Sequence, residues 1–269
     1  MGGSRPVVPC EGSPSSNAHP RSPSRCRPPD ARSSNLDGTV RRCNGPWCRP
    51  GAGDGGEAGA LRHRVDPAQA PFAAIGQVNT GAQGRCTGVL LRADLAVTAA
   101  HCVFNPATGR FLPPASIHFM LGYDRGAYAF QSVARAIRMD GAQNGDRSLA
   151  ALGRDWALLD LAAPAPASIA SIPLLPQAPA PGTALRAAGF GRDRAYALTV
   201  AEGCRVEGPA GLHLLAVRCP IIPGYSGGPL LDADGRLAAI AVASVGGQGE
   251  DMTALGVLAS AFASAIGDP

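Results

Sequence analysis

The stretch Gly224-Tyr225-Ser226-Gly227-Gly228-Pro229 decides the fold, once the residues around it along the chain are taken into account. The flanking Gly224 and Gly227 allow the backbone N–H groups of Gly224 and Ser226 to point into a single cavity. Donors placed in this way stabilise the charge that develops on an attacked carbonyl, and losing one typically costs about 3 kcal/mol in barrier. Ser226 is therefore a candidate nucleophile, and Gly224 and Ser226 form a candidate oxyanion hole.

Two further segments supply the groups that such a serine needs. Thr98-Ala99-Ala100-His101-Cys102 ends an apolar run and offers a base, and Asp155 opens a later apolar run and offers an acid. A serine hydroxyl is a weak nucleophile until a neighbouring imidazole takes its proton. A buried carboxylate holds that imidazole in the correct tautomer. We therefore expect His101, Asp155 and Ser226 to act together, with Asp160 as the nearest rival acid.

The order of these residues along the chain separates three architectures. The glycine-rich turn also fits the nucleophile elbow of α/β-hydrolases, but that fold needs a histidine after the serine, and none follows Ser226. The subtilisin order needs the acid before the histidine, which would leave Asp66 or Asp94 in that role within a sheet pattern that is not α/β. The order histidine, aspartate, serine remains.

After residue 66 the chain has an all-β pattern. Short apolar or alternating runs are separated by Gly, Pro and Asp at intervals of about ten residues, and no strand–helix alternation is visible. The run Pro164 to Pro181 holds six prolines, so we expect it to connect two halves of about six strands each. Alanine-rich residues 258–266 predict a short closing helix. The expected strands are 72–78, 86–91, 95–98, 117–121, 128–137, 156–161, 185–190, 198–206, 212–218, 229–231, 237–244 and 254–257.

Residues 1–64 differ from the rest in charge and composition. They hold ten arginines against five acidic residues, a net charge of +5, whereas residues 65–269 carry −1. Nine prolines, ten glycines and only five Leu, Ile, Val or Phe leave too little apolar area to offset the entropy of ordering. We expect a disordered tail before one domain over 65–269. No secretory signal follows Met1, which a wrongly chosen start codon or a genuine Arg-rich extension would explain.

Composition argues against several classes of function. All 24 basic residues are arginines and their excess lies in the tail, so the charge does not predict nucleic-acid binding. No uninterrupted run of about 18 apolar residues could span a membrane. Cys43 and Cys48 have no second ligand pair at metal-finger spacing, and no calcium or nucleotide motif is visible. We therefore expect no metal and no cofactor.

Four cysteines lie in the predicted domain, Cys86, Cys102, Cys204 and Cys219, and they allow three pairings. Cys86 and Cys102 bracket two apolar runs as a bridge across a hairpin would, and Cys204 and Cys219 do the same around 206–217. The pattern favours an oxidising compartment, so we expect a secreted or periplasmic protein.

These motifs, in this order, resemble those of trypsin-like (chymotrypsin-family) serine proteases of the compact bacterial kind, over roughly residues 66–266. The resemblance implies two six-stranded antiparallel β-barrels, about 66–163 and 182–257, with His101, Asp155 and Ser226 in the cleft between them. It also implies a bridge between Cys86 and Cys102.

The activity that the resemblance implies is hydrolysis of peptide bonds through an acyl-enzyme, with a polypeptide as substrate and a monomer as the default state. Two alternatives are an inactive homologue that binds peptides and a serine esterase on the same barrels.

One departure from the family pattern concerns activation. Tyr225 stands where vertebrate digestive relatives have an aspartate that pairs with a newly cut N-terminus. Arg62 and Arg64 remain sites at which the tail could be removed, but we expect the oxyanion site to be formed without that removal.

A second departure concerns specificity. Pro220 stands where trypsin has the acid that selects Lys or Arg. Ile221 and Ile222, with Ala243 and Ser244, would make the pocket wall apolar or small, which favours a medium-sized apolar side chain.

Overall fold

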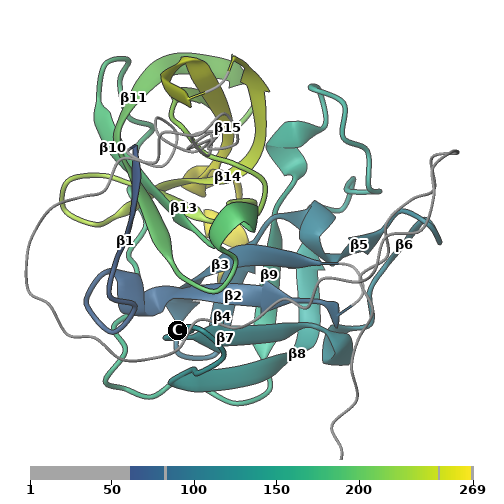
Figure 1. The fold of residues 1–269 in the computed structure, drawn as a ribbon. Coiled ribbons are helices and arrows are strands. Elements are labelled where there is room, and N and C mark those ends of the chain that lie inside the picture. Colours follow the sequence, from purple (N-terminus) through teal and green to yellow (C-terminus); the bar gives the residue numbers. More distant parts are fainter. Residues whose placement is uncertain (1–60, 82–83, 248, 268–269) are drawn as a thin grey trace, which may run out of the picture. The chain divides into compact units, whose positions relative to one another are not determined.

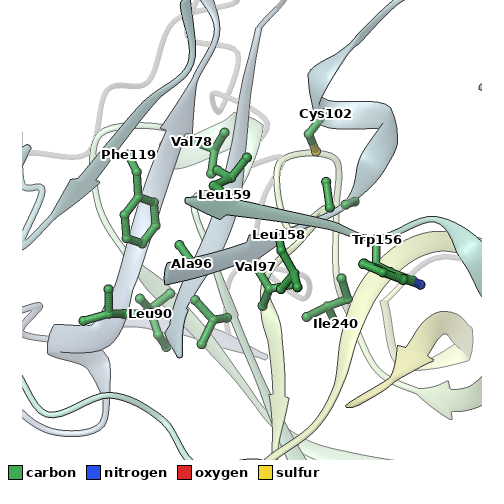
Figure 2. Packing of buried hydrophobic residues seen from close by; sticks show 14 of the residues in the cluster. Val78, Leu90, Ala96, Val97, Cys102, Phe119, Trp156, Leu158, Leu159 and Ile240 are labelled. Carbon is green, nitrogen blue, oxygen red and sulfur yellow. The ribbon is translucent and has the colours of Figure 1, made fainter. Parts of the chain in front are cut away.

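The computed structural model describes residues 61–81, 84–247 and 249–267 (Figure 1). The first of two barrels has the strand order β2-β3-β4-β9-β8-β7, and antiparallel pairing of β7 with β2 closes it. Apolar side chains from all six strands fill its interior, among them Val78, Leu90, Val97, Phe119 and Leu158, each fully buried (Figure 2). Its strands are β2 (Ile75–Asn79), β3 (Arg85–Arg92), β4 (Leu95–Thr98), β7 (His118–Leu121), β8 (Phe130–Met139) and β9 (Ala157–Leu161).

The second barrel has the order β11-β10-β13-β14-β15-β12, and the pairing of β12 with β11 closes it. A seventh strand, β1 (Arg62–Arg64), lies outside the ring and pairs antiparallel with β11. The six ring strands are β10 (Ala184–Gly189), β11 (Thr199–Gly211), β12 (Leu214–Arg218), β13 (Pro229–Leu231), β14 (Leu237–Gly246) and β15 (Met252–Leu258).

All twelve expected strands are present, and β4 and β13 have the predicted bounds. The first strand, expected over 72–78, begins later than predicted, because residues 72–74 form the 3-10 turn η1 (Phe72–Ala74) before β2. Two short strands were not expected, β5 (Phe104–Asn105) and β6 (Arg110–Phe111), since two residues show no alternation. The proline-rich run between β9 and β10 contains no named strand and connects the barrels as predicted.

The single closing helix expected over 258–266 is replaced by two 3-10 turns, η8 (Ala259–Ala261) and η9 (Ala263–Ala265). Phe262 interrupts the helical backbone between them, with φ −117° and ψ 0°. Its ring is fully buried and packs against Trp156, with the ring centroids 5.9 Å apart. Burial of this ring therefore overrides the helical preference of the alanines around it.

The other helical segments of the described residues are also short 3-10 turns, and none is long and apolar enough to cross a membrane. They are η3 (Ala100–Val103), η4 (Pro114–Ser116), η5 (Leu152–Arg154), η6 (Arg192–Arg194) and η7 (Gly249–Asp251).

The tail that we expected to be disordered overlaps the described residues only at its end. Residues 1–60, with Cys43 and Cys48, lie outside the described residues. Residues 62–64 form β1 instead, because they pair with β11 in register, Arg62 opposite Ala201 and Arg64 opposite Thr199. The folded chain thus begins before the expected boundary at residue 65.

Candidate active site

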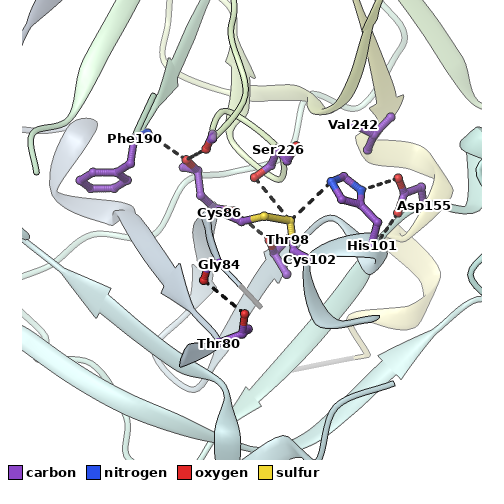
Figure 3. The surroundings of a disulfide bond; sticks show 12 residues. Thr80, Gly84, Cys86, Thr98, His101, Cys102, Asp155, Phe190, Ser226 and Val242 are labelled. Carbon is purple, nitrogen blue, oxygen red and sulfur yellow. Dashed lines mark hydrogen bonds and ion pairs between the residues drawn. A yellow bond between two sulfur atoms is a disulfide. The ribbon is translucent and has the colours of Figure 1, made fainter. Parts of the chain in front are cut away.

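The end of a buried strand and a disulfide together fix the position of His101. The residue lies in η3, which follows the fully buried β4 after one residue. The next residue, Cys102, is bridged to Cys86 on β3, with their Cα atoms 6.1 Å apart (Figure 3). A second bridge joins Cys204 and Cys219 across the β11–β12 hairpin, so both pairings indicated by the sequence are present.

Asp155 lies beside His101, immediately after η5. Its side chain is 1% exposed, and its Oδ2 is 2.7 Å from His101 Nδ1. Its Oδ1 accepts a hydrogen bond of 2.8 Å from the His101 backbone N–H. A buried carboxylate held to both the ring and the main chain orients the imidazole, so that Nε2 faces away and can serve as a base. The rival Asp160 is occupied elsewhere, because Arg138 donates to both its oxygens at 2.8 and 3.1 Å.

The turn that carries Ser226 lies against the first barrel and needs glycine at two positions. Gly224 has φ +105° and Gly227 has φ +77°, values that other residues rarely adopt. A Cβ on Gly224 would also lie 2.2 Å from the Phe190 carbonyl oxygen. Thr87 on β3 ties the turn down, because its N–H donates to the Ser226 carbonyl at 2.9 Å and its hydroxyl to the Gly224 carbonyl at 2.8 Å. The serine is therefore held close to the strand that bears Cys86.

The backbone donors of this turn fall into two groups. The N–H groups of Tyr225, Gly227 and Gly228 donate to backbone carbonyls. Among the described residues, those of Gly224 and Ser226 make no hydrogen bond. Two unengaged donors, two residues apart and on either side of the buried Tyr225, are what a developing oxyanion would require.

Ser226 and His101 both lie close to the Cys86–Cys102 disulfide (Figure 3). The Sγ of Cys102 is 3.8 Å from His101 Nε2 and 3.9 Å from the Ser226 carbonyl oxygen. The Ser226 hydroxyl makes no hydrogen bond to His101 within the part of the chain that the structure describes. Such bonds are often long in free enzymes and shorten when substrate binds. The structure thus brings together His101 and Asp155 from the first barrel and Ser226 from the second.

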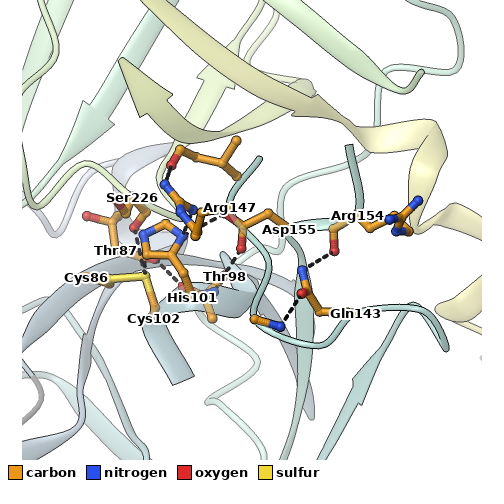
Figure 4. A network of polar contacts seen from close by, with 12 residues as sticks. Cys86, Thr87, Thr98, His101, Cys102, Gln143, Arg147, Arg154, Asp155 and Ser226 are labelled. Atoms are coloured by element: carbon orange, nitrogen blue, oxygen red, sulfur yellow. Dashed lines mark hydrogen bonds and ion pairs between the residues drawn. A yellow bond between two sulfur atoms is a disulfide. The ribbon is translucent and has the colours of Figure 1, made fainter. Parts of the chain in front are cut away.

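Arg147, which the sequence analysis did not single out, reaches into this site from the loop between β8 and η5 (Figure 4). Its Nη1 contacts both Asp155 Oδ2 and His101 Nδ1, and its Nη2 donates to the Val242 carbonyl at 2.9 Å. The Asp155 carboxylate can only accept, so its hydrogen bond to His101 requires the hydrogen on Nδ1 and leaves Nε2 free to accept a proton. Arg147 therefore shares Asp155 Oδ2 with the His101 ring. Nothing in the local sequence marks Arg147 among the 24 arginines of the chain.

The residues expected to line the specificity pocket lie in different surroundings. Pro220 is buried, and Ile221 is 4% exposed within the core of the second barrel. Ile222 and Ala243 are half-buried, and Ser244 is exposed near the end of β14. Ile221 therefore packs within the core, and the other members stay predicted pocket residues.

Comparison with known proteins identifies the family. Residues 86–240 match the family model described as a trypsin-like peptidase domain, and they make up more than half of the chain. The chain belongs to this family. A comparison with curated proteins finds no sequence match.

Solved structures support the fold assignment. A Glu endopeptidase in complex with MPD superposes with a TM-score of 0.65 at 17% identity, covering 76% of this chain and 94% of that one. A scabies mite inactivated protease paralogue gives 0.63 at 17% identity, and human heparin binding protein gives 0.60 at 21%. Both cover 76% of this chain and 93% of their own length. At these identities the likeness shows the trypsin-like double barrel alone.

Proposed function

We propose that this protein is a serine endopeptidase that cleaves peptide bonds through an acyl-enzyme on Ser226. The observation that carries the proposal is the pair of hydrogen bonds, 2.7 and 2.8 Å, that joins His101 to the buried Asp155 carboxylate. The Ser226 turn is tied by Thr87 to the barrel that bears this pair.

The proposed reaction uses each of these groups once. His101 Nε2 takes the proton of the Ser226 hydroxyl as Oγ attacks the scissile carbonyl. The N–H groups of Gly224 and Ser226 stabilise the oxyanion, and the Asp155 carboxylate stabilises the imidazolium. His101 then gives the proton to the leaving amine, and water releases the acyl group by the same steps in reverse.

Arg147 competes with the His101 ring for the Asp155 carboxylate, so its withdrawal frees that carboxylate for the reaction. The base needs a hydrogen on Nδ1 that is donated to Asp155 Oδ2, the oxygen that Arg147 also contacts. Because the Arg147 side chain is 41% exposed and comes from a loop, it can be displaced without unfolding a barrel. The contact therefore describes a resting state of the proposed enzyme.

A fluorophosphonate probe tests the proposal, because it reacts covalently with an activated serine. Treatment of the full chain followed by peptide mass spectrometry should place the adduct on Ser226. The matched control Ser226→Ala should show no adduct, and His101→Ala should lose nearly all labelling. A folded, disulfide-bonded wild-type chain that stays unlabelled would contradict the proposal.

The second candidate function is peptide binding by an inactive homologue. It is favoured by the position of Arg147 on the His101–Asp155 pair, and one structural neighbour is an inactivated protease paralogue. Labelling of Arg147→Ala but not of the wild-type chain, together with peptide binding by both, would support this alternative.

The surroundings of the site support two further parts of the proposal. None of the predicted pocket residues, Pro220, Ile221, Ile222, Ala243 and Ser244, is charged, so the preferred residue before the cleaved bond is a medium-sized apolar one. The two disulfides support a secreted or periplasmic location.

A further inference from the structure

Arg62 on β1 is buried, although strand β1 lies outside the ring of the second barrel. The whole residue is 4% exposed, and its Nη1 and Nη2 donate to the two carboxylate oxygens of Asp193 at 3.2 and 3.0 Å. The Asp193 side chain is 42% exposed, so the Arg62 side chain is the member of this pair that folding removes from water. Burying a guanidinium is costly unless it is paired. Arg64, two residues along, is 45% exposed and pairs with Asp124 instead.

Asp193, the partner of Arg62, belongs to a segment that holds one end of the Ser226 turn. Asp193 lies in η6, and the neighbouring Arg192 N–H donates to the Pro223 carbonyl at 2.8 Å. A Cβ on Gly224 would lie 3.1 Å from the same Arg192 nitrogen, so η6 and the turn are in close backbone contact. Fixing Asp193 therefore restrains the start of the turn.

Strand β1 also lies close to Tyr225, the residue immediately before the nucleophile, through the pairing of β1 with β11. Tyr225 is fully buried, and its hydroxyl is 2.7 Å from the Thr199 hydroxyl and 3.1 Å from the Thr199 carbonyl oxygen. Thr199 lies opposite Arg64 where β11 pairs with β1, so strand β1 runs beside the residue that anchors Tyr225. Burial raises the pKa of Tyr225, while the hydrogen bond to Thr199 and the charge of Arg62 oppose the rise. Burial alone would lower the pKa of Arg62, but the hydrogen bond to Asp193 and the charges around it raise the pKa. The guanidinium therefore stays charged beside Asp193 of η6.

We propose that Arg62 is a positioning residue that braces the Ser226 turn through Asp193, so that strand β1 is required for an ordered oxyanion site. Tyr225 offers no carboxylate to a new N-terminus, and Arg62 supplies a cation to this region from the intact chain. Cleavage after Arg62 or Arg64 would then loosen the site rather than activate it. The kinetic part of this inference rests on the proposed function.

The test compares full-length Arg62→Gln and Arg62→Lys with Arg64→Gln, a control on the same strand. Two quantities are measured: the rate of fluorophosphonate labelling at Ser226, and hydrogen exchange of peptides covering 219–228. Arg62→Gln should slow labelling about 100-fold, as expected for loss of an oxyanion donor, and should speed exchange in 219–228. Arg64→Gln should stay within about twofold of wild type, since its ion pair is exposed. Arg62→Lys should recover part of the rate, because it keeps the charge but not the two-pronged geometry.

Wild-type labelling and exchange in Arg62→Gln would overturn the inference. Equal effects of Arg62→Gln and Arg64→Gln would also overturn it, because the strand as a whole would then matter. Should Arg62→Gln fail to fold, Asp193→Asn removes the exposed partner, and labelling at the wild-type rate in that variant would contradict the brace. If even the wild-type chain is not labelled, the proposed function fails, whereas hydrogen exchange still decides whether Arg62 orders the turn.

Discussion

Substituting Gly227 by alanine should cost activity far more than stability. Its φ of +77° is unfavourable for alanine by about 1–2 kcal/mol. The added Cβ would also lie 2.3 Å from both the Thr87 carbonyl oxygen and the Thr98 hydroxyl. Relieving this overlap requires the turn to move by about 1 Å, and a misplacement of that size costs about 100-fold in rate. Because Ser226 is the preceding residue, the displacement falls directly on the nucleophile.

The assay measures the fluorophosphonate labelling rate and the thermal unfolding of Gly227→Ala beside Gly182→Ala. Gly182 is a matched control, because its φ is +83° and an added Cβ there would meet no atom within 4 Å. Gly182→Ala should lose about 1 kcal/mol of stability and keep its labelling rate. Labelling of Gly227→Ala at the wild-type rate would show that the position of the turn does not limit the reaction, contrary to this prediction.

Three further outcomes follow from the same contacts. Asp155→Asn should lower kcat by about 10⁴-fold with little change in KM, because its amide favours the wrong tautomer of His101; steady-state kinetics on a peptide substrate check this. Arg147→Ala should speed labelling about fivefold, because a larger fraction of the chain is competent, and an unchanged or slower rate would contradict the resting-state role. Burial would raise the pKa of Asp193, but its hydrogen bond to Arg62 lowers the pKa below the usual range. The stabilisation from that pair is therefore present above the ordinary carboxyl pKa and lost as pH falls through the lowered one, so thermal unfolding of Asp193→Asn should depend less on acid pH than that of wild type.

The double barrel could be predicted because each of its strands is marked by residues that are close together along the chain. Runs such as β4 and β13 are apolar, short and bounded by turn residues, which is enough to predict a strand. The order of His101, Asp155 and Ser226 then selected among architectures. The disulfide pairs were also indicated, because each pair closes a hairpin.

Strand β1 and Arg147 could not be predicted, because their partners lie far along the chain. Strand β1 has only three residues, which are too few to show a hydrophobic period. It is held by pairing with β11 and by the contact of Arg62 with Asp193, which lies 131 residues away along the chain. Arg147 lies in a polar loop and reaches Val242, 95 residues away. The closing helix was mispredicted for a similar reason, since burial of Phe262 against Trp156 depends on the assembled barrels.

Cleavage of a peptide library is the direct test of whether Ser226 hydrolyses peptide bonds. The full chain and Ser226→Ala are incubated with peptides that vary the residue before each bond, and mass spectrometry locates every cut, with a matched ester as a second substrate. We predict that the wild-type chain cuts peptide bonds after medium-sized apolar residues and that Ser226→Ala cuts none. Hydrolysis of the ester alone, or binding of peptides without any cut by the wild-type chain, would contradict it.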